Sequence, residues 1–311
     1  MKRRDFLKKS ITAGTASVAG AAFLPKIDLS RSGSILPGVT PDLAVVTGSD
    51  YFNNTVKAVH ALGGMKNFVT QNAKVGLLIN SPWKNPGTYT NPDIALAVVD
   101  MCFKAGAKEI YSIEDAAASY WKRSSLMENF KDEVASIKSS GRKNTKVVIP
   151  RGKKLKKADV SAALLECDVI IDIPICKDHS GTRFSCNLKN MMGACPHSTN
   201  RFFHLGSGAE GYYDDIDHLS QCIADLNLVR QPDLCIADAT EFVLTNGPSG
   251  PGDIKKAWKI VTGSNPVAVD TYCVKLRGLE PEKVQMITMA HEHGLGSMDI
   301  NSMAIEEINT Q

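Results

Sequence analysis

The segment DVIIDIPIC, residues 168–176, constrains the fold more than any other part of the sequence, because it is apolar along nearly its whole length. A run of this kind, with Pro174 near its end, is typical of a strand that is buried on both faces. Such strands occur in parallel sheets whose two faces are both covered by helices. The segment therefore predicts a sheet that lies between two layers of helices.

The rest of the chain alternates strand-like and helix-like segments, as crossover connections between parallel strands require. Asn91 followed by Pro92 is typical of a helix start, and the Asn246–Gly247 pair predicts a hairpin. The predicted fold class is α/β, with a doubly wound, mainly parallel sheet and helices on both faces. Strands are expected at residues 43–48, 74–80, 108–114, 145–150, 168–176, 233–238 and 257–263, and helices at residues 51–65, 91–107, 159–167 and 212–230 and after Asn265 and Pro281.

The first 25 residues are predicted to be a targeting segment. Arg3 and Arg4 precede a Phe-Leu pair and then a weakly apolar, small-residue stretch over residues 11–23, which is similar to a twin-arginine signal. The stretch is shorter than the roughly 20 apolar residues of a membrane span, so we expect no stable membrane span. We expect export to the periplasm or the extracellular space, with the twin-arginine translocase as a partner during export. The alternative is an ordinary amphipathic first helix.

These assignments predict the domain boundaries. Residues 1–25 are expected to be the signal peptide, residues 26–42 a linker, and residues 43–300 a single α/β domain. The domain could instead comprise two lobes that divide near residues 150–180. No internal repeat is found.

Charge limits the classes of partner. The chain has 36 Lys and Arg against 33 Asp and Glu, a net charge of +3, and its first 21 residues contribute five basic residues against Asp5, or +4. The body therefore carries about −1, which argues against binding of nucleic acid or of anionic membranes. The basic run at residues 141–157 is the exception, and we interpret it as a solvated surface around a strand rather than a binding patch.

The chain has eight cysteines but no C-x-x-C pair. The absence of such a pair argues against a zinc ribbon, a ferredoxin-type cluster and a thioredoxin motif. Because the twin-arginine route carries folded proteins, often with an inserted cofactor, the signal favours a bound cofactor. Most of the thiols are expected to be small core residues.

The polar stretch at residues 177–204, KDHSGTRFSCNLKNMMGACPHSTNRFFH, is the leading site candidate, because it begins where the apolar strand stops. Ligands of open α/β sheets bind outside the carboxyl ends of the strands. The loops at residues 79–92 and 246–253 are expected at the same edge of the sheet. In the second loop, Gly247 and Gly250 could bring backbone amides to a bound anion, or could simply form turns.

A helix is expected over residues 184–194 within this stretch. One stripe is apolar, and a second stripe brings together Cys186, Lys189, Asn190 and Gly193. Lys189, with Asn190 beside it, could bind a phosphate or carboxylate of a cofactor, or act as a base or nucleophile. The alternative is an exposed lysine on the flank of a helix.

The histidines suggest acid–base or metal chemistry. His179, His197 and His204 lie within 26 residues of one another, and imidazole serves as a proton shuttle or a metal ligand. We predict His179 and Lys189 as catalytic residues. We predict His204, His179 and Cys186 as ligands of a transition metal such as nickel, iron or zinc, although their spacing matches no standard zinc template. Simple polar wall residues are the alternative.

The sequence resembles the domain-of-unknown-function family three-six-two, whose members are often exported or linked to iron–sulfur proteins. The matching motifs are KDHSGTRFSCNLKNMMG, FFH, PDLCIADATEFVLTNGPSGPG, GSNPVAVD ending at Asp270, and HGLG, in the order of the family, over residues 43–296. We expect no appended ferredoxin domain of the kind found in some members, and the sequence reads LINSP where a lysine usually precedes the asparagine.

A shorter motif is similar to the nickel-pincer lactate racemases. His179, Lys189 and His204 keep the order of three functional residues of those enzymes, at spacings of 10 and 15. The resemblance implies that His179 shuttles a proton, Lys189 carries the pincer nucleotide and His204 binds nickel. The glycine-rich element between the first two residues is replaced by SGTRFSCN.

Two functions are therefore considered. The first is an exported, metal- or cofactor-dependent enzyme that acts on a small anionic, hydroxy-acid-like substrate at the carboxyl edge of the sheet, with Asp238 and Asp270 as orienting carboxylates or as helix caps. The second is a non-catalytic periplasmic protein that binds a ligand or a redox partner at the same edge.

Overall fold

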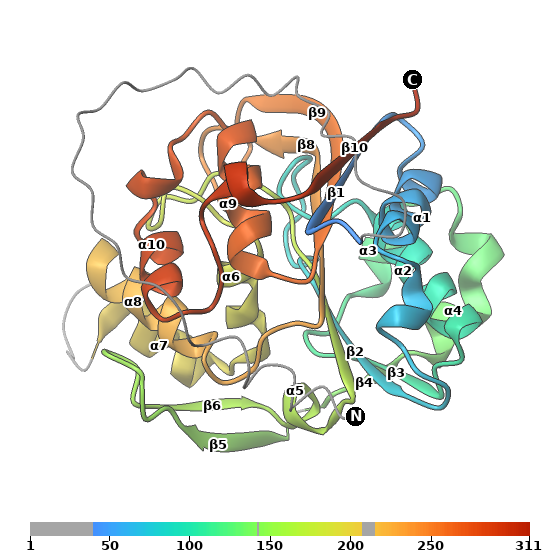
Figure 1. The fold of residues 1–311 in the computed structure, drawn as a ribbon. Helices are drawn as coiled ribbons and strands as arrows, with labels where there is room; N and C mark the ends of the chain where they lie inside the picture. The colour runs from blue at the N-terminus through green and yellow to red at the C-terminus, as the bar shows by residue number, and fades with distance from the viewer. Residues whose placement is uncertain (1–39, 142, 207–214) are drawn as a thin grey trace. The chain divides into compact units, whose positions relative to one another are not determined.

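The computed structural model describes residues 40–141, 143–206 and 215–311, and these form one compact unit. The predicted signal peptide and nearly all of the predicted linker lie outside the described residues. Figure 1 shows a central sheet with helices on both of its faces and a separate two-stranded sheet beside α7. The strands are β1 (Leu43–Thr47), β2 (Lys74–Ile79), β3 (Glu109–Ser112), β4 (Lys138–Ser139), β5 (Asn144–Val148), β6 (Lys157–Ser161), β7 (Val169–Ile173), β8 (Leu234–Val243), β9 (Ile254–Gly263) and β10 (Ile305–Asn309).

The central sheet has the strand order β10-β1-β9-β8-β7-β2-β3-β4. Only β9 runs antiparallel to its neighbours, so the prediction of a mainly parallel sheet is confirmed. β8 and β9 form the hairpin that the Asn246–Gly247 pair predicts. β10 pairs in parallel with β1 and was not predicted, so the sheet takes in residues 305–309, past the expected boundary at residue 300.

All five residues of β7 are buried, as the apolar run requires. One face of the sheet packs on α1 (Tyr51–Ala61) and α2 (Pro92–Ala105), and the other on α6, α8, α9 and α10. The side chain of Asn91 caps α2, and Gly106 ends it in the left-handed region. The remaining helices are α3 (Ala118–Trp121), α4 (Lys131–Ser136), α5 (Ala162–Glu166), α6 (Asn187–Asn190), α7 (His197–Leu205), α8 (Ile216–Leu226), α9 (Pro266–Leu276) and α10 (Gln285–Glu292).

The segment 145–167 differs from the prediction. Residues 145–150 are strand-like as expected, but β5 pairs antiparallel with β6 in a sheet of its own. The helix expected at residues 159–167 is instead the end of β6 followed by the short α5. In β6, Ala158 and Val160 are buried at alternate positions, a period of two that a helical reading overlooks.

None of the helices within the described ranges is long and apolar enough to cross a bilayer.

Candidate functional site

A pocket of about 360 Å³ lies at the carboxyl ends of β2 and β7. Its walls come from the loop after β2, the segment after β3, the stretch after β7, and α7. His179, Lys189 and His204 all line it. The structure therefore brings together three of the predicted site residues from across the polar stretch.

Lys177, the first residue of the stretch, has a side chain that is almost inaccessible, with the residue 1% exposed. Its Nζ donates hydrogen bonds to Asn80 Oδ1 at 3.0 Å and to Thr88 O at 2.5 Å. Burial, helped by the nearby charge of Lys189, lowers the pKa of Lys177 to about 7. A lysine amine with this pKa is partly deprotonated near neutral pH, which is rare for lysine.

Glu114 lines the same pocket from the segment that follows β3. Burial raises the pKa of its carboxyl to about 7, and the charge of Lys177 opposes that rise. Gly193 leaves room for the carboxylate, because a Cβ at residue 193 would lie 2.4 Å from Glu114 Oε2. Neither Glu114 nor Lys177 was predicted as a site residue, although Glu114 ends one predicted strand and Lys177 directly follows another.

His179 is buried, and its Nδ1 accepts a hydrogen bond of 3.0 Å from the backbone N–H of Gly181. The neutral ring therefore carries its proton on Nε2. Burial, followed by the charges of Lys189, His204 and Lys177, lowers the pKa of His179 to about 2. Near neutral pH, His179 is an uncharged hydrogen-bond donor rather than a proton carrier.

The helix expected over residues 184–194 is shorter than predicted. α6 is only four residues long and continues as a 3₁₀ helix over Met191–Ala194. Lys189, Asn190 and Gly193 line the pocket, as the second stripe predicts. Cys186 does not, because it precedes the first helical residue and its side chain lies in the apolar core. The predicted stripe therefore fails at Cys186.

The predicted metal ligands His179, His204 and Cys186 do not form one group. Across residues 40–141, 143–206 and 215–311, no three His, Cys, Asp or Glu side chains are grouped so that they could hold a metal ion. Two imidazoles alone do not complete the coordination of a protein-bound transition metal. A metal centre built only from described side chains therefore does not fit this pocket.

Two buried carboxyl groups fix α6 in place. Asp270 accepts hydrogen bonds from the backbone N–H groups of Asn187 at 2.8 Å and Leu188 at 3.0 Å. Asp172 accepts one from Asn190 Nδ2 at 2.6 Å. Burial raises the pKa of Asp270 to about 6 and that of Asp172 well above its usual range. Asp270 thus orients the element that carries Lys189, as predicted for an orienting or capping carboxylate.

Asp238 has a similar anchoring role on the other side of the sheet edge. It accepts hydrogen bonds from the Asn91 backbone N–H at 2.7 Å and from both the backbone N–H and the hydroxyl of Thr240, at 2.9 and 2.6 Å. Burial raises its pKa to about 6. Asp238 does not line the pocket, and it joins the start of α2 to β8.

Gly247 and Gly250 serve close packing of the loop rather than lining the pocket. A Cβ on Gly247 would lie 1.9 Å from Asp178 O, and Gly250 has φ +64°. The Gly247 N–H donates to Asp178 Oδ2 at 2.9 Å, so that amide is already used inside the protein. From this loop, Pro248 is the residue that reaches the pocket.

α7 closes the pocket with Asn200 and His204, which lie one helical turn apart. His197, at the first position of the same helix, is exposed and lies outside the pocket lining. The three histidines of the polar stretch are therefore split into two pocket residues and one surface residue.

Two comparisons with known sequences give matches. The model of the family described as "Domain of unknown function (DUF362)" matches residues 74–275, more than half of the 311-residue chain. A thylakoid-associated protein from Synechocystis is 24% identical over 244 residues, which cover 76% of this chain and 72% of that protein.

Solved structures resemble the chain more weakly. The lactate racemase apoprotein from Thermoanaerobacterium thermosaccharolyticum has a TM-score of 0.39 and 12% identity, over 65% of this chain and 52% of that one. A protein from Thermotoga maritima has a TM-score of 0.39 and 10% identity, over 79% of this chain and 60% of that one. The chain thus covers less than two thirds of either solved chain, and no residue role is carried over from them.

Proposed function

The chain belongs to the family described as "Domain of unknown function (DUF362)", and from that premise we propose that the pocket at the ends of β2 and β7 binds a small organic anion, such as a hydroxy acid, and moves a proton on it. The observation that carries the proposal is the buried Lys177 amine, which lies in one pocket with a second lysine and two histidines.

Lys177 is suited to act as the base. A neutral amine has two N–H groups and one lone pair, and the two hydrogen bonds to Asn80 Oδ1 and Thr88 O use both N–H groups. The lone pair then remains for a substrate. Because the pKa of Lys177 is about 7, a large share of the protein holds this base free at neutral pH, the condition under which general-base catalysis is most effective.

Lys189 is suited to hold the carboxylate of the substrate. Its side chain is half-buried at the pocket wall, and its charge is among the causes that lower the pKa of both Lys177 and His179. An anion placed among these groups relieves that like-charge repulsion, and burial strengthens the attraction. His179 can donate its Nε2 proton to an oxygen of the same substrate.

The proton transfer follows from these positions. The bond from hydrogen to the carbon beside the carboxylate breaks, the proton moves to Lys177 Nζ, and the electron pair spreads onto the oxygens held by Lys189 and His179. The proton returns to carbon from Lys177, or from Glu114, whose carboxyl is partly protonated near pH 7. The net result is exchange or inversion at that carbon.

The similarity to nickel-pincer racemases suggests a cofactor-dependent variant, in which Lys189 carries a nucleotide and His204 binds a metal. The described side chains alone do not complete a metal site, so the nucleotide on Lys189 would have to supply the remaining ligands. That variant requires a covalent adduct on Lys189, which mass spectrometry of the purified protein detects as an increase in mass.

A second candidate function is anion binding without chemistry. The observation that favours it is the anion-binding set itself, because Lys189 and the Nε2–H of His179 would attract a carboxylate whether or not Lys177 removes a proton. A bound ligand that never exchanges its carbon-bound hydrogen would favour this function over the first.

We also propose export by the twin-arginine route, on the basis of Arg3, Arg4 and the small-residue stretch after them. Fractionation of cells that express the full chain tests this, with Arg3→Lys/Arg4→Lys as the variant. Loss of the protein from the periplasmic fraction in that variant is the expected result.

The activity test follows hydrogen exchange at carbon. The protein is incubated in deuterium oxide with lactate, glycerate or malate, and NMR measures loss of the hydrogen beside the carboxylate. We expect the native chain to exchange this hydrogen and Lys177→Met to lose the exchange. Lys84→Gln should retain it, because Lys84 is exposed on the neighbouring loop and does not line the pocket. Exchange that survives Lys177→Met unchanged contradicts the proposal.

A further inference from the structure

A second pocket, of about 320 Å³, lies between the β5–β6 sheet and α7. Four lysines and one carboxylate, that of Asp159, line it. All four lysines come from the basic run at residues 141–157, which the sequence led us to interpret as a solvated surface. Counting side-chain charges, four positive and one negative leave +3 on this wall. The four lysines are Lys146, Lys154, Lys156 and Lys157. Together with the other lining residues they form what we call the basic pocket.

Among the described residues, the four amines of the basic pocket form no ion pair with a carboxylate. Other lysines of the same run do: Lys143 pairs with Glu166 at 2.7 Å and Lys153 with Glu292 at 3.1 Å. Within the described ranges, none of the ion pairs involves the pocket lysines. Uncompensated like charges around one hollow repel each other, and a bound anion would relieve that repulsion.

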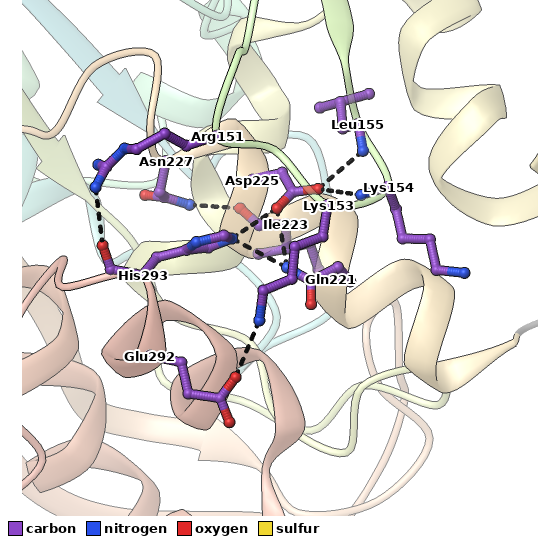
Figure 2. Close-up of polar contacts among 10 residues, drawn as sticks. All are labelled: Arg151, Lys153, Lys154, Leu155, Gln221, Ile223, Asp225, Asn227, Glu292 and His293. Atoms are coloured by element: carbon purple, nitrogen blue, oxygen red, sulfur yellow. Dashed lines mark hydrogen bonds and ion pairs between the residues drawn. The ribbon is translucent and has the colours of Figure 1, made fainter.

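The buried carboxylate of Asp225 fixes the segment that carries these lysines. Its Oδ2 accepts the backbone N–H groups of Lys154 at 2.6 Å and Leu155 at 2.8 Å, while its Oδ1 accepts from Gln221 at 2.9 Å and lies 2.7 Å from His293 Nε2. Figure 2 shows the Lys154 side chain extending away from this cluster. Asp225 therefore holds the backbone at residues 154 and 155 in place, while the Lys154 amine points away from it.

α7 supplies the opposite wall. Ser198 and Thr199, in its first turn, line the pocket, and no side chain caps this end of the helix. Thr199 Oγ1 exchanges hydrogen bonds with the backbone of Asp159, at 3.1 and 3.2 Å, and so ties α7 to β6. Backbone N–H groups at a helix start add to the attraction for an anion.

Part of the pocket lining is apolar. Leu155, Ala158 and Phe202 contribute to it, and the Phe202 ring makes a T-shaped contact with His218 at a centroid distance of 5.2 Å. Positive charge together with an apolar and aromatic surface suits a ligand that has both a multiply charged end and an apolar body.

We propose that the basic pocket is a binding site for a phosphate ester whose organic part lies on Phe202, separate from the pocket at the ends of β2 and β7. Its phosphate interacts with the lysine amines and the first turn of α7. The same phosphate chemistry occurs in free metabolites and in lipid headgroups, and the hollow shape favours a free ligand.

Calorimetry on the full chain tests the proposal, with pyrophosphate as a probe of charge alone and phenyl phosphate as a probe of charge with a ring. We expect both to bind. Lys156→Gln/Lys157→Gln should weaken both by about tenfold. The control Lys66→Gln/Lys108→Gln removes the same charge from exposed positions outside the pocket and should change affinity by less than about twofold. Phe202→Ala should weaken phenyl phosphate selectively.

Three outcomes overturn the proposal. The first is no binding of either probe, and the second is equal weakening by both double variants, which would mean a general charge effect. The third is binding only to vesicles that contain phosphatidylglycerol, and not to phosphatidylcholine vesicles or to the free probes. That outcome would make the lysines a membrane-contacting surface instead. Thermal unfolding of each variant checks that the fold is intact.

Discussion

The two pockets use the same residue type in opposite ways. In the pocket at the ends of β2 and β7, Lys177 is 1% exposed, and burial lowers its pKa to about 7. In the basic pocket, the four lysines are exposed and water solvates their charges. A buried amine can exchange a proton near neutral pH, whereas exposed amines offer mainly electrostatic attraction. The comparison assigns proton chemistry to the first pocket and anion binding to the second.

The two pockets also share α7 as a wall, and a buried aspartate supports the backbone of each. α7 presents Asn200 and His204 to one pocket and Ser198, Thr199 and Phe202 to the other. Each pocket is backed by a buried aspartate that accepts two consecutive backbone N–H groups: Asn187 and Leu188 for Asp270, Lys154 and Leu155 for Asp225.

The pKa values of the two aspartates are shifted in opposite directions. Burial raises the pKa of Asp270 to about 6, so its ionised form is disfavoured in the fold. Burial also acts on Asp225, but hydrogen bonds from the backbone of residues 153–155 and from His293 outweigh it and lower the pKa. The stabilising contribution of Asp225 is therefore present above its ordinary value of 3.8 and is lost as the pH falls through its lower pKa in the fold.

The largest expected effect separates the roles of the two lysines in the first pocket. Lys177→Met should lower the rate constant of hydrogen exchange at carbon at least about 100-fold, because it removes the base. Lys189→Met should instead raise KM with a smaller change in kcat, because it removes a binding contact. Steady-state exchange rates over a range of substrate concentrations measure both. Equal effects on kcat and KM in the two variants would break the distinction between base and anchor.

The next effect concerns Asp225, the buried carboxylate behind the basic pocket. Asp225→Asn should destabilise the protein by about 2–3 kcal/mol at neutral pH, because an amide cannot accept all the hydrogen bonds that the carboxylate accepts. The loss should shrink as the pH falls below 3.8 and through the lower pKa of the folded carboxylate, where the native group also protonates. Urea unfolding at several pH values measures it. Asp100→Asn, which affects an i,i+4 pair with an exposed Lys104, should cost about 0.5 kcal/mol or less.

The sequence predicted the scaffold well where a single segment carries the signal. The apolar run at residues 168–176 predicts the buried strand, and the Asn91–Pro92 pair predicts the start of α2 within a residue. Prediction failed for β10, because short edge strands lack a strong apolar pattern, and for residues 157–167, where a period of two passes directly into one turn of helix.

The site was predicted only in part for a related reason. His179, Lys189 and His204 lie in one stretch and could be grouped by proximity in sequence, and all three line the pocket. Glu114 reaches the pocket from a different strand, so only the sheet order reveals it. Lys177 is unusual because its side chain is buried, and burial depends on tertiary packing, which the residue type does not predict. Cys186 was misplaced because it precedes the first residue of α6, so the helical spacing does not extend back to it.

A pH profile sharpens the contrast between buried and exposed amines. The exchange rate should rise through about pH 7 as Lys177 loses its proton, because the base is the deprotonated form. Lys189→Met removes a charge that lowers the pKa of Lys177, so the rise should move to higher pH, by up to about one unit. Lys157→Gln, in the basic pocket, should leave the profile in place. A shift of equal size in both variants would show that net charge, not local position, sets the pKa.

The smallest expected effect tests whether Glu114 belongs to the first pocket in function as well as in place. Gly193→Ala places a Cβ 2.4 Å from the present position of Glu114 Oε2, so the carboxylate must move. Because that carboxylate raises the pKa of Lys177, its displacement should lower this pKa and move the rise of the exchange rate to lower pH, by less than about one unit. The matched measurement repeats the substitution in a Glu114→Gln background, where the neutral amide removes the charge in advance. If Gly193→Ala acts through Glu114, its effect on the pH profile should largely disappear there, whereas an effect that persists undiminished would place its cause in the packing of α6.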